Sequence, residues 1–345
     1  MMMNNTDLRL IWRPIPLLTI ALSVTSASLL YLFFRSKLRE ENVVKSTKPF
    51  NSNVDETPVN SIGTPHPYVH SNLYNNCIYL DYNATTPVYP EVSAKIIPFL
   101  TNCFGNPSSS HVFSEIAKSS LTAARISVGN LINSAKPETE IFFTSCGTES
   151  DNRAIDIAIK HFYNSHSDNI NLLPEIITCA IEHPAVICYL RVLKIQGKIN
   201  LKIIEVDSSG LVNVDLIRSS LTRQTALVTI MHSNNEVGTI QPLREIADAI
   251  KSFNKATNVH ILLHSDAAQS VGKVCVDVQS SEIDLLTIVG HKYGAPKGVA
   301  ALFVREGVRW DPIADSTLPM LIGGGQERGA RGGEMDYLNT DALLL

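Results

Sequence analysis

A lysine follows a short apolar run in the segment TIVGHKYGAPKG, which spans residues 287–298. This lysine, Lys292, lies directly after His291 and between two nearby glycines. A lysine at such a place is either a strand-end charge that reaches for water or a reactive amine. A reactive amine can form a Schiff base with a carbonyl compound. The polar residues elsewhere in the chain decide between these two interpretations.

Polar residues also follow the other apolar runs. In an open α/β sheet, ligands bind outside the carboxyl ends of the strands. The residues after the runs therefore predict one crevice that contains Lys292 and His291. The other side chains expected there are Gly147, Thr148, His183, Asn235, Asp266 and Gln269.

Each of these residues also has a purely structural interpretation. Thr148 is a suitable helix N-cap, and Asp266 could cap a helix as well. Asn235 is a common turn residue, and a lone histidine such as His183 is often a core residue with its hydrogen bonds satisfied. Their convergence on one edge of a sheet favours a ligand site over separate structural roles.

The cofactor that suits this set is pyridoxal phosphate (PLP). Lys292 would bind its aldehyde, and Asp266 would keep its ring nitrogen protonated. Gly147 and Thr148 open a helix, whose N-terminus suits a phosphate. The imidazole of His183 would stack on the ring. The chain has no GxGxxG after its first strand and no GxxxxGK[ST], which argues against a dinucleotide or nucleoside triphosphate site.

Strand-like and helix-like segments alternate beyond residue 76. The apolar runs have strand lengths, and the stretches between them place apolar residues on one helix face. This order predicts an α/β fold with a mainly parallel sheet and helices on both faces. The expected strands are 140–146, 175–181, 225–231, 259–264, 284–289 and 299–304, and the expected helices include 114–132 and 243–254.

Composition excludes several classes of protein. The chain has 345 residues, 44% of them hydrophobic and 18% charged, so it is globular rather than disordered. A net charge of −4 without a basic run argues against nucleic acid as a partner. The six cysteines are scattered without a CxxC pair, which indicates reduced thiols. No metal site is expected, because His260 and His264 lie on a predicted strand.

The N-terminus differs from the rest of the chain. Residues 14–34 carry no charge and are long enough to span a membrane. The excess of Lys and Arg after them predicts a single-pass anchor with the catalytic part facing the cytosol. A mitochondrial presequence and a secretory signal peptide are the alternatives.

Four regions are expected from this organisation. They are a membrane anchor at 1–39, a polar linker at 40–75, a PLP-binding domain at 76–330 and a divergent tail at 331–345.

The motifs together resemble the cysteine desulfurases and selenocysteine lyases of the class V aminotransferase family. The resemblance runs from IYLDYNATTPVYPEV through FGNPSSSHVF, TSCGTESDNRAI, IEHPAV, HSNNEVGTIQP, HSDAAQSVGK and VGHKYGAPKG to GGGQERG. It implies a PLP-dependent transferase fold, in which the small domain is expected to be largely missing, and a homodimer. The implied reaction removes sulfur or selenium from L-cysteine or L-selenocysteine and leaves L-alanine.

The resemblance also implies residue roles. Lys292 would be the Schiff-base lysine, Asp266 would hold the ring nitrogen, and His183 would stack on the ring and move protons. Asn235 and Gln269 would contact the ring hydroxyl or the substrate, Thr148 and His291 would bind phosphate, and the loop at 83–86 would line the substrate pocket.

The sequence also departs from the family. Val289 stands where many desulfurases have a serine, which favours the selenocysteine lyase branch. Glu334 stands where a threonine would help to bind the partner subunit's phosphate. The mobile cysteine that carries sulfur and the arginine that binds the substrate carboxylate are not found at their expected places.

Other interpretations follow from these departures. One is a truncated chain that binds PLP or dimerises without turnover, and a weaker one is a plain aminotransferase. A sulfur or selenium acceptor protein is a further expected partner.

Overall fold

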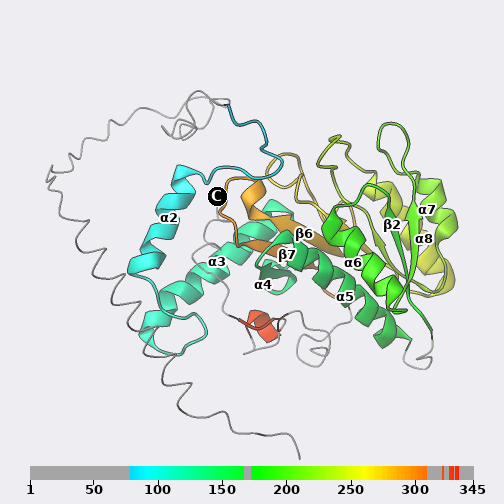
Figure 1. The fold of residues 1–345 in the computed structure, drawn as a ribbon. Helices are drawn as coiled ribbons and strands as arrows, with labels where there is room; N and C mark the ends of the chain where they lie inside the picture. Colours follow the sequence, from blue (N-terminus) through cyan, green and yellow to red (C-terminus); the bar gives the residue numbers. More distant parts are fainter. Residues whose placement is uncertain (1–77, 167–171, 309–320, 322–325, 330, 334–345) are drawn as a thin grey trace, which may run out of the picture. The chain divides into compact units, whose positions relative to one another are not determined.

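The computed structural model describes residues 78–166, 172–308, 321, 326–329 and 331–333 (Figure 1). The predicted membrane anchor at 1–39 and linker at 40–75 lie outside these residues, so both stay predictions. Within the described residues, no helix combines the length and the apolar character that a membrane crossing needs.

A seven-stranded sheet forms the centre of the described part. Strand β7 is antiparallel to both of its neighbours, and the other pairs are parallel. The mainly parallel α/β sheet expected from the sequence is therefore confirmed. The strands lie in the order β1 (Ile141–Thr144), β7 (Ala300–Val304), β6 (Leu285–Val289), β5 (Leu262–Asp266), β4 (Thr225–Thr229), β2 (Glu175–Cys179) and β3 (Asn200–Ile204).

Strand β3 is missing from the sequence prediction. It lies at the edge of the sheet and pairs only with β2 among the described strands. Only the last residue of β3 is buried, and Lys202 lies at its centre. The strand therefore lacks the apolar run by which the buried strands were predicted. The prediction for β5 was also displaced. Asp266 is the last residue of that strand rather than a residue after it.

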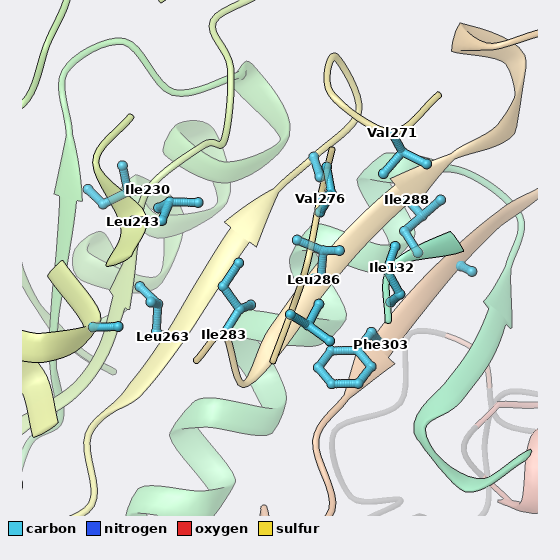
Figure 2. Packing of buried hydrophobic residues seen from close by; sticks show 14 of the residues in the cluster. Ile132, Ile230, Leu243, Leu263, Val271, Val276, Ile283, Leu286, Ile288 and Phe303 are labelled. Atoms are coloured by element: carbon cyan, nitrogen blue, oxygen red, sulfur yellow. The ribbon is translucent and has the colours of Figure 1, made fainter. Parts of the chain in front are cut away.

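The strands bury side chains on both faces, as in sheets covered by helices on both sides. Neighbouring residues of one strand enter different hydrophobic clusters: Leu286 joins the larger cluster and Leu285 the smaller one. Figure 2 shows part of the larger cluster, in which Leu286 lies between Leu263 and Phe303. The described helices are α2 (Pro90–Thr101), α3 (Glu115–Leu131), α4 (Pro137–Glu140), α5 (Gly147–Ser165), α6 (Pro184–Ile195), α7 (Val214–Ser220) and α8 (Leu243–Thr257).

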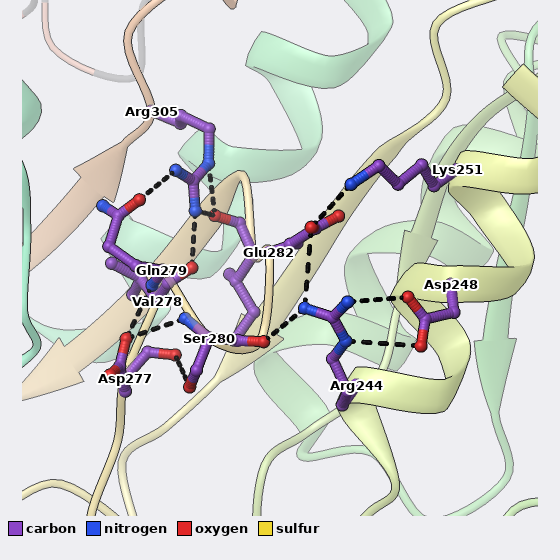
Figure 3. Close-up of polar contacts among 10 residues, drawn as sticks. Arg244, Asp248, Lys251, Asp277, Val278, Gln279, Ser280, Glu282 and Arg305 are labelled. Atoms are coloured by element: carbon purple, nitrogen blue, oxygen red, sulfur yellow. Dashed lines mark hydrogen bonds and ion pairs between the residues drawn. The ribbon is translucent and has the colours of Figure 1, made fainter. Parts of the chain in front are cut away.

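Two arginines hold the loop that leads into β6. Arg305 donates a 3.0 Å hydrogen bond to Gln279, and Arg244 donates one of 2.7 Å to the carbonyl of Ser280 (Figure 3). Lys251 of α8 also pairs with Glu282, at 2.7 Å. These contacts lie near the amino end of β6, away from the strand ends that carry the predicted site.

Candidate active site

The predicted site residues all line one cavity of about 250 Å³. The cavity lies beyond the carboxyl ends of β2, β4, β5 and β6 and beside the N-terminus of α5. Its lining includes Gly147, Thr148, His183, Asn235, Asp266, Gln269, His291 and Lys292. The structure therefore brings the eight residues together, whereas their roles toward a cofactor stay a prediction.

Lys292 is a half-buried amine held by the loop at 83–86. Its Nζ donates hydrogen bonds to the carbonyls of Asn83, at 2.6 Å, and Ala84, at 2.9 Å. Desolvation lowers the pKa of Lys292, while the nearby carboxylates of Asp266 and Asp81 act in the opposite direction. A lysine whose pKa is lowered has more of the neutral, nucleophilic amine. This environment favours the reactive-amine interpretation over a charge that reaches for water.

Asp266 is the carboxylate of the cavity that faces Lys292. It is 6% exposed, and its Oδ1 accepts a 2.9 Å hydrogen bond from the backbone N–H of Ala268. Asp266 therefore caps a turn, as its structural interpretation predicted, and it also lines the cavity. Burial raises the pKa of Asp266, and the hydrogen bond from Ala268 and the interactions with His183 and Lys292 oppose that rise.

His183 is an exposed N-cap residue of α6 and not a core histidine. Its Nδ1 accepts a 3.2 Å hydrogen bond from the backbone N–H of Ala185. Because Nδ1 is occupied as an acceptor, the ring proton is assigned to Nε2. Proline at the first position of α6 has no N–H to satisfy, which suits this helix start. The fold thus fixes the ring at the mouth of the cavity with one N–H available.

The first turn of α5 forms a cup for an anion. The first N–H groups of a helix have no partners within that helix, and the helix dipole favours negative charge there. Gly147 and Thr148 begin α5 and line the cavity. Glu149 holds this turn in place, because its Oε2 accepts a 2.8 Å hydrogen bond from the backbone N–H of Ser145. The position of this anion site thus follows from the ordinary geometry of a helix start.

Val289 explains why a glycine begins α5. A Cβ added at Gly147 would lie 2.6 Å from Cγ2 of Val289, a separation that forces one of them to move. Gly147→Ala is therefore expected to destabilise the chain by about 1–3 kcal/mol, the usual cost of overpacking. Without the clash, the same change would stabilise by about 0.4–1 kcal/mol, so the sign of the effect is informative.

Urea unfolding of both single variants and the double variant Gly147→Ala/Val289→Ala measures this contact. The double variant should be less destabilised than the sum of the singles. If Gly147→Ala were as stable toward urea as the wild type, the steric interpretation would be contradicted.

Asn83 connects the loop at 83–86 to the cavity wall. Its side chain donates a 3.1 Å hydrogen bond to the carbonyl of Asn235, and its own carbonyl accepts one of 2.9 Å from Gln269. His291 contacts the same loop, because its Nδ1 lies 3.1 Å from Oγ1 of Thr85. The loop was expected to line the pocket. The structure shows contacts between this loop and the lining residues, and its place in a substrate pocket stays a prediction.

Two buried carboxyl groups were missed by the sequence analysis. Asp151 of α5 lines the cavity and is 1% exposed, and Glu182 precedes His183 and is 7% exposed. Burial raises the pKa of Glu182 to about 8. A signal for Asp151 was present, because it lies one helical turn before Ile155 on the apolar face of α5.

The comparisons with known proteins agree with one another. The aminotransferase class-V family matches residues 78–328. The chain is 44% identical over 259 residues to a cysteine desulfurase of Nostoc sp., which covers 74% of this chain and 58% of that protein. It is 41% identical over 258 residues to the cysteine desulfurase IscS of Clostridium botulinum, covering 74% of this chain and 59% of the other. The match thus spans less than two thirds of the length of these curated relatives.

Solved structures share the fold. A NifS-like protein superposes with a TM-score of 0.68 at 35% identity, covering 77% of this chain and 67% of the other. The structure of SspA in complex with cysteine gives a TM-score of 0.67 at 33% identity, covering 77% of this chain and 70% of the other.

Proposed function

The chain belongs to the aminotransferase class-V family, and from this we propose that it removes sulfur from L-cysteine, or selenium from L-selenocysteine, and leaves L-alanine. Its relatives include cysteine desulfurases, and that family depends on PLP. The observation that carries the proposal is the single cavity that holds Lys292, Asp266, His183 and the N-terminus of α5.

The residues present fit PLP. The aldehyde would find the amine of Lys292, and the ring nitrogen would find the carboxylate of Asp266. The phosphate would find the first turn of α5, where Gly147 leaves the backbone without a side chain. The exposed ring of His183 suits stacking. The cavity thus contains an amine, a carboxylate, a helix N-terminus and an imidazole, which are the groups that PLP needs.

Each residue would have a definite task in the reaction. Bound PLP withdraws electrons from the substrate and so acidifies its α-carbon. Lys292 would take up and return protons at Nζ, for which its lowered pKa is suitable. His183 would donate its Nε2 proton. Asp266 would hold the proton of the ring nitrogen as an ion pair.

Two finer proposals concern the substrate and the assembly. Val289 in place of a serine supports a preference for L-selenocysteine. A homodimer is supported by large apolar side chains exposed on the described segment before β1, such as Phe104, at 65%, and Phe113, at 68%. An exposed apolar patch of this kind is typical of a protein interface.

Alanine production tests the proposed function. The full chain would be purified with PLP and mixed with L-cysteine or L-selenocysteine, and alanine would be quantified by amino-acid analysis. We expect alanine from at least one substrate, and more from L-selenocysteine. Pyridoxamine phosphate with a keto acid would indicate an aminotransferase. Cofactor binding without alanine would contradict the proposal and favour a chain that binds PLP without turnover.

A further inference from the structure

The cavity contains a second carboxyl group that the proposed chemistry does not use. Asp151 projects from α5, lines the cavity and is 1% exposed. Its Oδ1 has no hydrogen-bond partner among the described residues. A buried carboxylate oxygen without a partner is costly, whereas a protonated carboxyl group avoids that cost.

Asp151 lies close to the carboxylate that is proposed to hold the cofactor ring. One carboxylate oxygen of Asp151, one of Asp266 and one ring nitrogen of His183 lie within 4.8 Å of one another. Two carboxylates at this separation in a buried site repel each other strongly, so one of them retains a proton. The remaining question is which of the two carries it.

The surroundings of the two groups differ. Burial raises the pKa of Asp266 as well, but the hydrogen bond from Ala268 and the interactions with His183 and Lys292 oppose that rise. No cation is among the groups that act on the pKa of Asp151, although a ring nitrogen of His183 lies within 4.8 Å of its carboxylate. Nε2 of His264 lies 3.8 Å from Oδ1 of Asp151, which is too far for a hydrogen bond.

His264 cannot supply the missing charge, because burial lowers its pKa to about 3. Burial, and then the charge of Asp266, raises the pKa of Asp151 well above its usual range. The proton is thus assigned to Asp151, and Asp266 keeps the negative charge.

The other groups that face Asp151 do not change this assignment. Glu182 adds negative potential only when ionised, and its pKa of about 8 keeps it mostly neutral at pH 7. The thiol of Cys146 also raises the pKa of Asp151 when ionised, and a hydrogen bond from Thr287 opposes the rise. Within the described part of the chain, the titratable or charged groups around Asp151 are Asp266 and His264 of β5, Glu182 and His183 before α6, Cys146 before α5, and Lys292 after β6.

We propose that Asp151 is a positioning residue that holds a proton, so that Asp266 alone presents a negative charge to the ring nitrogen of the cofactor. The part of this inference that concerns the cofactor rests on the proposed function. The part that concerns the proton rests on the cavity itself and can be measured without PLP.

The first measurement follows urea unfolding of the cofactor-free full chain between about pH 5 and pH 8. The folded pKa of Asp151 lies above its unfolded value, so the wild type loses stability as pH rises from the unfolded toward the folded pKa. Asp151→Asn has no such proton. The unfolding midpoint of the variant, relative to wild type, is therefore expected to shift upward with pH.

Two further experiments keep the inference testable if Asp151→Asn does not fold. Asp151→Ser removes the carboxyl group without adding volume and takes the place of Asp151→Asn. If neither folds, carbon NMR of labelled aspartate carboxyl groups in the wild type reports the same proton directly.

The second measurement titrates the visible absorbance of the PLP-loaded chain against pH. The wild type should show one ionisation that is absent from Asp151→Asn. Asp156→Asn is the matched control, since Asp156 lies on the same helix and burial raises its pKa to about 6. It bonds to Tyr189, at 2.6 Å, and does not line the cavity, so the titration of the absorbance should not change.

The outcomes separate the inference from the proposed function. A stability difference that does not vary with pH would overturn the inference, even with a normal Lys292-dependent absorbance. An identical absorbance titration in wild type and Asp151→Asn would overturn the action of Asp151 through Asp266. If no Lys292-dependent absorbance forms at all, the proposed function fails and the role of Asp151 toward the cofactor fails with it.

Discussion

Lys292→Ala is expected to abolish alanine production, with a loss of at least about 10³-fold, and to remove the visible absorbance of bound PLP. The reason is that Lys292 supplies the amine of the cavity, and no other lysine lines it among the described residues. Its ammonium is bound by the carbonyls of Asn83 and Ala84, which fix Nζ near Asp266. Absorbance spectra and alanine quantification of the purified variant measure both effects.

A neighbouring lysine provides the control for that experiment. Lys297 lies in the same glycine-containing segment, is exposed and does not line the cavity. Lys297→Ala should keep both the absorbance and the activity. Visible absorbance that survives in Lys292→Ala would show that a different amine binds the cofactor, and the site assignment would then be wrong.

Glu327→Gln is expected to destabilise the chain by about 3–5 kcal/mol, the cost of breaking a buried ion pair from one side. Glu327 accepts hydrogen bonds from Arg125 of α3 and, at 2.8 Å, from the backbone N–H of Phe143 in β1. The side chains of Arg125 and Glu327 are only 10% and 2% exposed. Glutamine keeps the shape and the acceptor for Phe143 but leaves the guanidinium buried without its counter-charge.

Urea unfolding measures this effect, and two variants control it. The double variant Arg125→Met/Glu327→Gln should cost less than Glu327→Gln alone, because no uncompensated charge remains. Glu306→Gln breaks the exposed pair with Lys136, whose side chains are 55% and 61% exposed, and should cost no more than about 1 kcal/mol. Equal effects of Glu327→Gln and Glu306→Gln would contradict the importance of the buried pair.

Much of the architecture and the candidate site could be predicted from the sequence. Continuous apolar runs alternate with amphipathic stretches, and this pattern alone requires a sheet covered on both faces. Because the carboxyl ends of parallel strands meet at one edge, residues as distant as Thr148 and Lys292 could be placed in one cavity. The family followed from motifs that were already present in the sequence.

The interactions that set the properties of this site were not predictable in the same way. The side chain of Val289 in β6 leaves no room for a Cβ at Gly147 in α5. Asp151 comes close to Asp266 only when α5 packs on the sheet. The pairing of Arg125 with Glu327 likewise joins segments far apart in the chain.

Local patterns report which face of an element is buried, since that depends on the spacing of its own residues. They do not report which side chain of another element lies opposite. The fold class, the family and eight residues of the candidate site could thus be predicted from the sequence, whereas the buried Asp151 of the same cavity was missed. The surroundings of the carboxyl groups in this cavity, and hence their pKa values, depend on how the elements pack, because burial and neighbouring charges shift a pKa.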